Sequence, residues 1–301
     1  MSALDTITTP GRASRAAGFS VPRLLSVKTR RILPGFPLAL GVTLLYLGAI
    51  VLLPLAALVL QAFNVGWEQF VNIILSPRTL AAFRVTVLSA LGATVFNGIF
   101  GLGLAWVLSR YEFPGRRVLD ALVDVPFALP TAVAGLALTS LFAQNGPFGP
   151  VLDALGITVV YTPIGIALAM AFTSLPFVVR SVQPVLDDLG ADVEEAAQTL
   201  GAGGWRIFRS VIFPSIFPAF LAGCSLAFAR ALGEFGAVIF IAGNQPGKTE
   251  IAVLLTFIRL QEFDYPAAAA IAVVMLAAAF VMLLVTNAVQ SWHLRYVTRG
   301  E

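Results

Sequence analysis

The segment ADVEEAAQTLGAGGWRIFRSVIFP, residues 191–214, is the longest polar interruption in the second half of an otherwise apolar chain. Asp192 and Glu195 have the spacing of a capping box, in which acidic side chains accept hydrogen bonds from the free amides of a helix start. We therefore expect a short helix to begin here. Gly201 can adopt the left-handed conformation that ends such a helix, and a second amphipathic run, residues 205–214, follows it.

These signals alone fit a surface helix, a turn and a second helix between two membrane spans. The spacing adds information: Glu195-Ala196-Ala197 is followed by three residues and Gly201, then by nine residues and Val211-Ile212-Phe213-Pro214. This pattern resembles the cytoplasmic EAA loop of ABC import permeases, E-A-A-x3-G-x9-I-x-L-P, with conservative departures at Val211 and Phe213. The resemblance implies a coupling helix that docks in a cleft of a separate ATPase subunit. Its contact or positioning residues would be Asp192, Glu195, Ala196, Ala197, Gly201 and Pro214.

The composition predicts an integral membrane protein. Of 301 residues, 58% are hydrophobic and 12% are charged, whereas an ordinary soluble domain has roughly 25% charged residues. Residues 1–36 are polar and basic, which is typical of a cytoplasmic tail. The apolar run at 37–60 is longer than the core of a secretory signal, about 7–15 residues, so we predict a first membrane span there.

Five more spans are predicted from apolar runs of about 20 residues. They lie at 85–108, 121–143, 162–180, 216–241 and 267–290, within a permease core of 80–291 that is followed by a tail of 292–301. Pro126, Pro130, Pro163 and Pro176 are expected to bend or interrupt the third and fourth spans. The chain is thus expected to be an all-α membrane protein with six transmembrane helices.

The distribution of cations predicts the orientation of these spans. Segments on the side of the N-terminus carry most of the arginines, and the opposite side carries only Arg78, Arg84, Lys248 and Arg259. The positive-inside rule therefore places both termini and residues 191–214 in the cytoplasm. On the outer side, residues 251–260 are apolar but too short to cross, which predicts a re-entrant or interfacial helix.

No catalytic or metal site is predicted. Cys224 and His293 are the only cysteine and histidine, so an intrachain disulfide and a cysteine metal cluster are excluded, and we expect His293 to be structural. Residues 243–249, GNQPGKT, have three residues between their glycines where a phosphate-binding P-loop needs four. The chain is therefore not expected to hydrolyse nucleotide or to be an enzyme, and nothing indicates nucleic-acid binding.

Arg230 and Glu234 lie within the predicted fifth span, where an unsheltered charge is costly. Their spacing allows an ion pair on one helix face. Two interpretations remain open: mutual neutralisation inside the bundle, or a polar lining on the path of an anion. Asp124 and Asn97 are expected to be packing or interfacial groups.

Further stretches resemble the sulfate and molybdate permeases. They are ARALGEFGA at 229–237, IAGN at 241–244 and PGKT at 246–249, and the sulfate branch is favoured by RYEFPGRR at 110–117, DVPFALPTAVAGL at 124–136, FVVRSVQPVL at 177–186 and DYPAAAA at 264–270. Together these stretches resemble the T subunits of sulfate/thiosulfate importers over roughly residues 60–290.

This resemblance implies a type I ABC importer permease of the bacterial inner membrane. The expected partners are a related W-type permease subunit, two copies of an ATPase that binds ATP-Mg, and a periplasmic binding protein for sulfate or thiosulfate; no cofactor is expected on this chain. A molybdate or tungstate permease is the nearest alternative. An ion-gradient-driven secondary transporter fits the composition equally well, but it predicts internal repeats and midplane carboxylates, and only Glu234 lies deep in a span.

Overall fold

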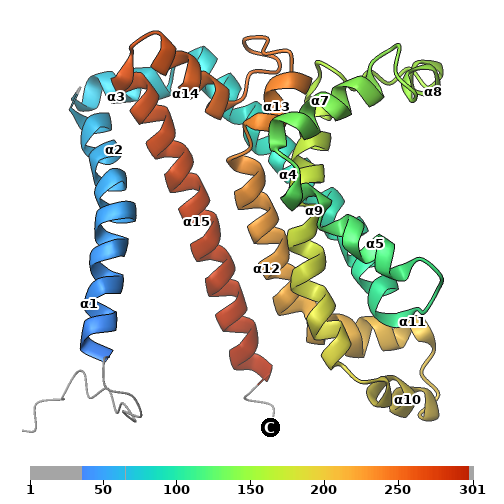
Figure 1. Ribbon diagram of the computed structural model, residues 1–301. Coiled ribbons are helices and arrows are strands. Elements are labelled where there is room, and N and C mark those ends of the chain that lie inside the picture. Colours follow the sequence, from blue (N-terminus) through green and yellow to red (C-terminus); the bar gives the residue numbers. More distant parts are fainter. Residues whose placement is uncertain (1–35, 65, 298–301) are drawn as a thin grey trace, which may run out of the picture. The chain divides into compact units, whose positions relative to one another are not determined.

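The computed structural model of the chain describes residues 36–64 and 66–297. The expected basic tail lies outside this part except for its last residue, as do the final four residues of the expected C-terminal tail. Every regular element in the described part is helical, as Figure 1 shows. The helices are α1 (Phe36–Leu47), α2 (Leu53–Phe63), α3 (Trp67–Ile74), α4 (Pro77–Arg110), α5 (Arg116–Val123), α6 (Val125–Ala128), α7 (Thr131–Phe142), α8 (Gly149–Ala154), α9 (Pro163–Asp188), α10 (Ala191–Thr199), α11 (Gly204–Ile207), α12 (Phe213–Leu232), α13 (Gly236–Ile241), α14 (Ala252–Gln261) and α15 (Tyr265–Val297), with π-helical turns at Gly48–Leu52 and Phe208–Ile212.

The chain divides into two compact units after Val51. The described part of the first unit consists of α1 and a π-helical turn, in which no side chain is buried. The second unit begins at Leu52 and contains all the other helices.

Five stretches of helix are long and apolar enough to cross a membrane. Within the described residues they are Phe36–Phe63, Pro77–Arg110, Pro163–Asp188, Gly204–Leu232 and Tyr265–Val289. Each corresponds to an expected span, although the bounds differ: Pro77–Arg110 begins before and ends after its expected run, whereas Gly204–Leu232 begins before its expected run and ends before it does. Pro176 was expected to bend or interrupt its span, and α9 is not interrupted there but continues through it. Pro163 lies in the first turn of α9, where a missing N–H is tolerated. The orientation of both termini stays a prediction.

The expected third span, 121–143, is not a continuous helix. It is divided into α5, α6 and α7, with Leu129 in an extended conformation before Pro130. The residue before a proline is pushed out of the helical region by the proline ring, which accounts for the interruption before Pro130. Pro126 lies in the first turn of α6, directly after the break that ends α5. Helix α7 has only 12 residues, and a sixth crossing therefore stays a prediction.

The expected fifth span, 216–241, is also broken. Helix α12 ends at Leu232 and α13 begins at Gly236. Between them, the Oε1 atom of Glu234 accepts a hydrogen bond from the backbone N–H of Ala237, 2.9 Å away. This bond satisfies one of the free amides of α13 and so stabilises a new helix start.

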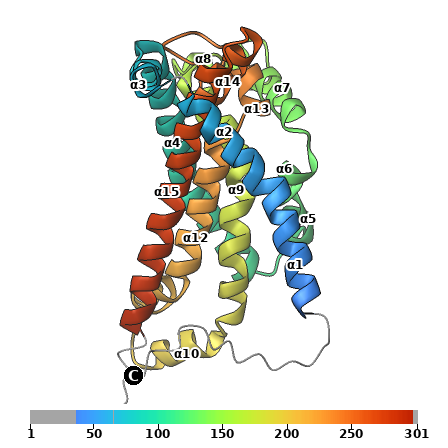
Figure 2. The ribbon, with the colours of Figure 1, turned by 90° about the vertical axis from the view of Figure 1, so that its left-hand side faces the viewer.

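Helices α4, α9 and α12 pack against one another and form the centre of the second unit, as Figures 1 and 2 show. Their contact faces hold two of the three buried apolar clusters. Buried Asn97 of α4 donates hydrogen bonds to the carbonyl oxygen of Ala171 and the hydroxyl of Ser174 in α9, both at 2.9 Å. Such bonds join helices in a membrane, and they give Asn97 the packing role expected for it.

The short helices α7 and α13 contact each other closely. A Cβ atom on Gly135 would overlap the backbone of Ala237, so this approach requires glycine. The two helices that follow the breaks in the third and fifth expected spans are thus packed directly against each other.

Candidate functional site

Helix α10 begins and ends near the expected residues, but it lacks the expected capping box. Gly190 is the residue before the helix, and no side chain caps it. Asp192 is the second helical residue, two positions too late to act as the cap, and Glu195 is the fifth residue of the helix. The prediction of a short helix is confirmed, whereas the prediction of its cap is wrong, because Gly190 starts the helix two residues before Asp192.

Gly201 ends α10 in the predicted way. Its φ angle is +80°, and its N–H donates to the carbonyl oxygen of Gln198, while the N–H of Ala202 donates to that of Ala197. This pair of bonds is a Schellman motif, which needs a residue in the left-handed conformation at this position. The chain therefore leaves α10 abruptly.

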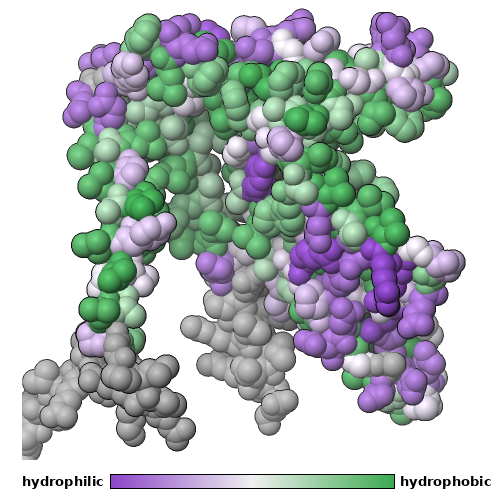
Figure 3. Space-filling view, in the orientation of Figure 1, coloured by the Kyte–Doolittle hydropathy of each residue, from purple (hydrophilic) through white to green (hydrophobic). Residues whose placement is uncertain are grey.

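One face of α10 is exposed in the part of the chain that the structure describes. Asp192, Glu195 and Ala196 are exposed, and Leu200 is 88% exposed. Ala197 faces the opposite way and packs against the buried cluster formed by α4, α9 and α11. Figure 3 shows hydrophilic side chains gathered at this end of the second unit. The helix thus presents an outer face with both charged and apolar groups.

An ion pair that the sequence did not reveal holds α10 in place. Arg110, the last residue of α4, lies 2.8 Å from Glu194 through its Nη2 and Oε1 atoms. The same Nη2 atom donates to the carbonyl oxygen of Leu189, also at 2.8 Å, and the guanidinium lies 5.8 Å from the ring centroid of Trp106. Nothing in the sequence pairs these positions, since they are brought together only by the fold.

Pro214 was expected to end the second amphipathic run, but it lies inside a longer helical stretch. Residues 204–232 are helical throughout, and Pro214 occupies the first turn of α12 directly after the π-helical turn Phe208–Ile212. Hydrogen bonds change register where a π turn meets an α-helix, so the missing N–H of proline is accommodated there.

Arg230 and Glu234 form the expected pair, with 2.6 Å between Nη1 and Oε2. They do not share one continuous helix face, because Glu234 lies in the break after α12. The Oε2 atom has no hydrogen bond of good geometry, so the charge of Arg230 is its main polar partner. The Glu234 side chain is only 1% exposed, whereas the Arg230 side chain is 32% exposed. The carboxylate is therefore buried, while part of the arginine side chain remains accessible.

A second ionic cluster includes Asp124, which was expected to be a packing or interfacial group. Arg180 of α9 donates from Nε and Nη2 to the two carboxylate oxygens of Asp124, at 2.9 and 2.6 Å. Its Nη1 atom donates to Asp120 at 2.6 Å and to the Gln183 side chain at 2.7 Å. A bidentate guanidinium–carboxylate pair fixes geometry as well as charge. It ties the interrupted third segment to α9.

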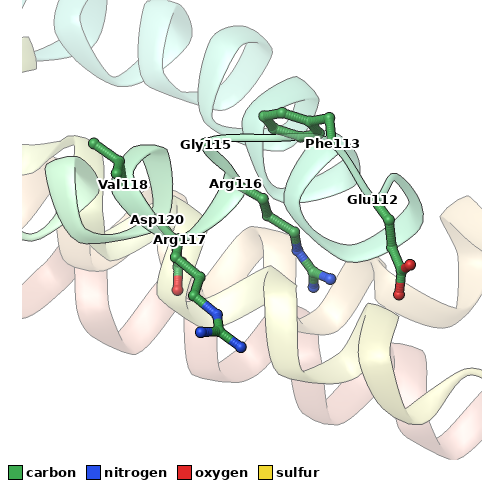
Figure 4. Close-up of a pocket in the computed structure, with 7 residues that line it drawn as sticks. All are labelled: Glu112, Phe113, Gly115, Arg116, Arg117, Val118 and Asp120. Atoms are coloured by element: carbon green, nitrogen blue, oxygen red, sulfur yellow. The ribbon is translucent and has the colours of Figure 1, made fainter.

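Beside Asp120 lies a hollow of about 560 Å³. It is formed by the turn between α4 and α5 and by the start of α5. Glu112 of the turn and Arg116 and Arg117 of α5 project toward the same side, as Figure 4 shows. Because the residues that line it include cations and carboxylates together, it shows no preference for one sign of charge.

Residues 97–299 match the family described as binding-protein-dependent transport system inner membrane component. The chain is 58% identical over 268 residues to a sulfate transport system permease protein CysT of Salmonella typhimurium, covering 89% of this chain and 97% of the relative. It is 46% identical to the CysT protein of Synechocystis sp. over 85% of this chain and 89% of that relative. The fold is similar to that of a bacterial ABC transporter involved in alginate import, with a TM-score of 0.70 and 18% identity over 85% of this chain and 94% of that one. The chain therefore belongs to the family of inner membrane components of binding-protein-dependent transport systems.

Proposed function

We propose that this chain is the T-type permease subunit of an ATP-driven importer that carries sulfate or thiosulfate across the bacterial inner membrane. It would work with a W-type permease subunit, two copies of an ATPase and a periplasmic binding protein. The observation that carries the proposal is α10: a short helix with the EAA spacing, an exposed outer face and a Schellman exit at Gly201. The relatives named as sulfate permeases support the choice of substrate.

The geometry suggests how ATP hydrolysis on the partner reaches the membrane. The outer face of α10 would dock in the cleft of the ATPase, while Ala197 and the Arg110–Glu194 ion pair hold the inner face against the bundle. A movement of the ATPase would then displace α10 together with the end of α4, since the ion pair joins them. ATP-Mg would be bound by the ATPase, and this chain would contribute no catalytic group.

The nearest alternative is a permease for molybdate or tungstate, which are tetrahedral dianions like sulfate. A secondary transporter is less well supported, because its one deep acid, Glu234, is held by Arg230 and by the start of α13. Both of its carboxylate oxygens thus have a partner inside the bundle.

Uptake into proteoliposomes tests the proposal. The complete complex would be reconstituted with ATP inside, with the binding protein and labelled sulfate outside, and without an ion gradient. We expect sulfate uptake that requires ATP and is inhibited by thiosulfate. Uptake of molybdate but not sulfate would assign the alternative substrate, and uptake that requires an imposed ion gradient instead of ATP would contradict the ABC mechanism.

A further inference from the structure

The four cations predicted for the outer side differ in whether they are neutralised. Arg78 forms a bidentate ion pair with Glu250, with hydrogen bonds of 2.9 and 2.7 Å. Arg259 forms an ion pair with Glu262 at 3.0 Å. Arg84 and Lys248 are exposed and form no ion pair with any residue that the structure describes. Two positive charges are thus left available on this side.

Arg84 lines a hollow of about 590 Å³, and so does Gly247, the residue before Lys248. One stripe of α4 forms most of its wall, and Pro163 at the start of α9 and Gly247 complete it; the stripe includes Pro77, Leu80, Arg84 and Leu88. Arg84 is the sole charged residue among the described residues that line the hollow, and Lys248 directly follows Gly247. The hollow therefore carries positive charge on a mainly apolar wall.

The loop that carries Lys248 is firmly anchored. The carbonyl oxygen of Gln245 accepts the backbone N–H groups of residues 248, 249 and 250, and the buried hydroxyl of Thr249 accepts the N–H of Gln245 at 3.0 Å. The neighbouring Glu250 is 1% exposed and is held by Arg78 of α4. The backbone at Lys248 is thus fixed relative to α4, while its side chain remains long and flexible.

The position of Arg84 calls for an anionic partner or water. It lies seven residues after the start of a helix that is apolar enough to cross a membrane, about 10 Å along its axis at 1.5 Å per residue. An arginine that faced lipid at this depth would be costly. Its planar group can donate two parallel hydrogen bonds to an oxyanion, and apolar walls strengthen its attraction for an anion.

We propose that Arg84 and Lys248 form a receiving site for a tetrahedral oxyanion that the binding protein releases on the outer side. This inference rests on the proposed function and adds to it the place where the substrate first contacts this chain. Two cations match the charge of a dianion. Only Arg84 lies in the wall of the hollow. Lys248 follows Gly247 in the chain and would reach the anion with its long side chain, so the anion can be held without being trapped.

The test compares sulfate uptake with ATP hydrolysis in proteoliposomes that contain the complete transporter. The variants are Arg84→Gln, Lys248→Gln and the double variant, with Arg259→Gln as a control on the same side. If the site receives sulfate, the double variant should move about fivefold less sulfate per ATP, because released anion escapes before it enters. Stimulation of the ATPase by the loaded binding protein should stay at the wild-type level, and Arg84→Lys should restore part of the ratio.

Three outcomes would overturn this inference. An unchanged sulfate-to-ATP ratio in the double variant would exclude a receiving site. A weaker affinity for the loaded binding protein, with a normal ratio at saturation, would show that the cations bind acidic groups of that protein. A loss of thermal stability that depends on anionic lipid, again with a normal ratio, would assign them to lipid phosphates. Failure of wild-type protein to take up sulfate would instead contradict the proposed substrate, and the same ratio would then be measured with molybdate.

Discussion

Arg110 and Glu194 join the end of α4, a helix of 34 residues, to the helix with the EAA spacing. Their Nη2 and Oε1 atoms are 2.8 Å apart, and their side chains are 18% and 22% exposed. The same guanidinium binds the carbonyl oxygen of Leu189, in the link between α9 and α10. One side chain thus connects α4, α9 and α10, and we expect it to fix the angle at which α10 meets the ATPase.

The first prediction is that Arg110→Gln weakens docking of the ATPase without preventing membrane insertion. A partly buried ion pair of this kind contributes about 1 kcal/mol, which is roughly a fivefold change in an equilibrium constant. Recovery of the ATPase on the purified permease, measured over a range of ATPase concentrations, should show this shift. The Arg110→Glu/Glu194→Arg double variant should recover part of the loss, and Arg259→Gln, which breaks an exposed pair elsewhere, should have no effect.

The sequence predicted α10 and its exit but could not predict what holds the helix in place. Gly201 is informative because only a left-handed residue completes the Schellman motif. Arg110 and Glu194 carry no local signal, since each could equally face solvent in an isolated helix. The pairing of Arg180 with Asp124 was not predicted for the same reason: it depends on the break in the third segment, which turns Asp120 and Asp124 toward α9.

The second prediction concerns the exit from α10. Gly201→Ala should destabilise the turn by about 1–2 kcal/mol, the cost of a Cβ atom in the left-handed region. Gly203→Ala is a matched control, because its φ angle is −73° and both glycines have open space around them. We expect lower ATPase recovery and a proteolytic cut near residue 201 for the first variant only. Equal behaviour of the two variants would show that the left-handed exit does not matter for docking.

The third prediction concerns Glu195, which is exposed on the outer face of α10. Because it lies beyond the first turn, its charge contributes little to helix stability through the macrodipole, and an effect of Glu195→Lys must come from the contact with the partner. We expect impaired ATPase recovery and uptake, with normal expression and helix content. Asp187→Lys reverses the charge of another exposed acid near this end and should be harmless. Normal uptake in Glu195→Lys would argue against α10 as the docking helix.

The break between α12 and α13 shows another limit of the sequence. The spacing of Arg230 and Glu234 predicted an ion pair, which is confirmed, but on the face of one helix. In the structure Glu234 has two partners: it forms the ion pair with Arg230, and it accepts a hydrogen bond from the N–H of Ala237. A hydropathy pattern cannot reveal this, because the residues on both sides of the break are equally apolar.

The last prediction uses the unequal burial of Arg230 and Glu234. Arg230→Met should be the more damaging single change, because it leaves a carboxylate that is 1% exposed without its counter-charge, and removing one partner of a buried pair typically costs about 3–5 kcal/mol. Glu234→Gln should be milder, since the amide oxygen can still accept the N–H of Ala237 and Arg230 retains access to water. The amounts of folded protein and of assembled complex measure this difference.

The double variant, Arg230→Met with Glu234→Gln, then separates the two interpretations of the pair. If the charges only neutralise each other, the double variant should assemble better than Arg230→Met alone and should transport sulfate at a rate near that of the wild type. If the accessible end of Arg230 lowers the barrier that a dianion meets in a low-dielectric region, the double variant should assemble normally but transport slowly. Uptake near the wild-type rate at equal protein level would refute a role in the anion path, because no charge would remain at either position to act on the substrate.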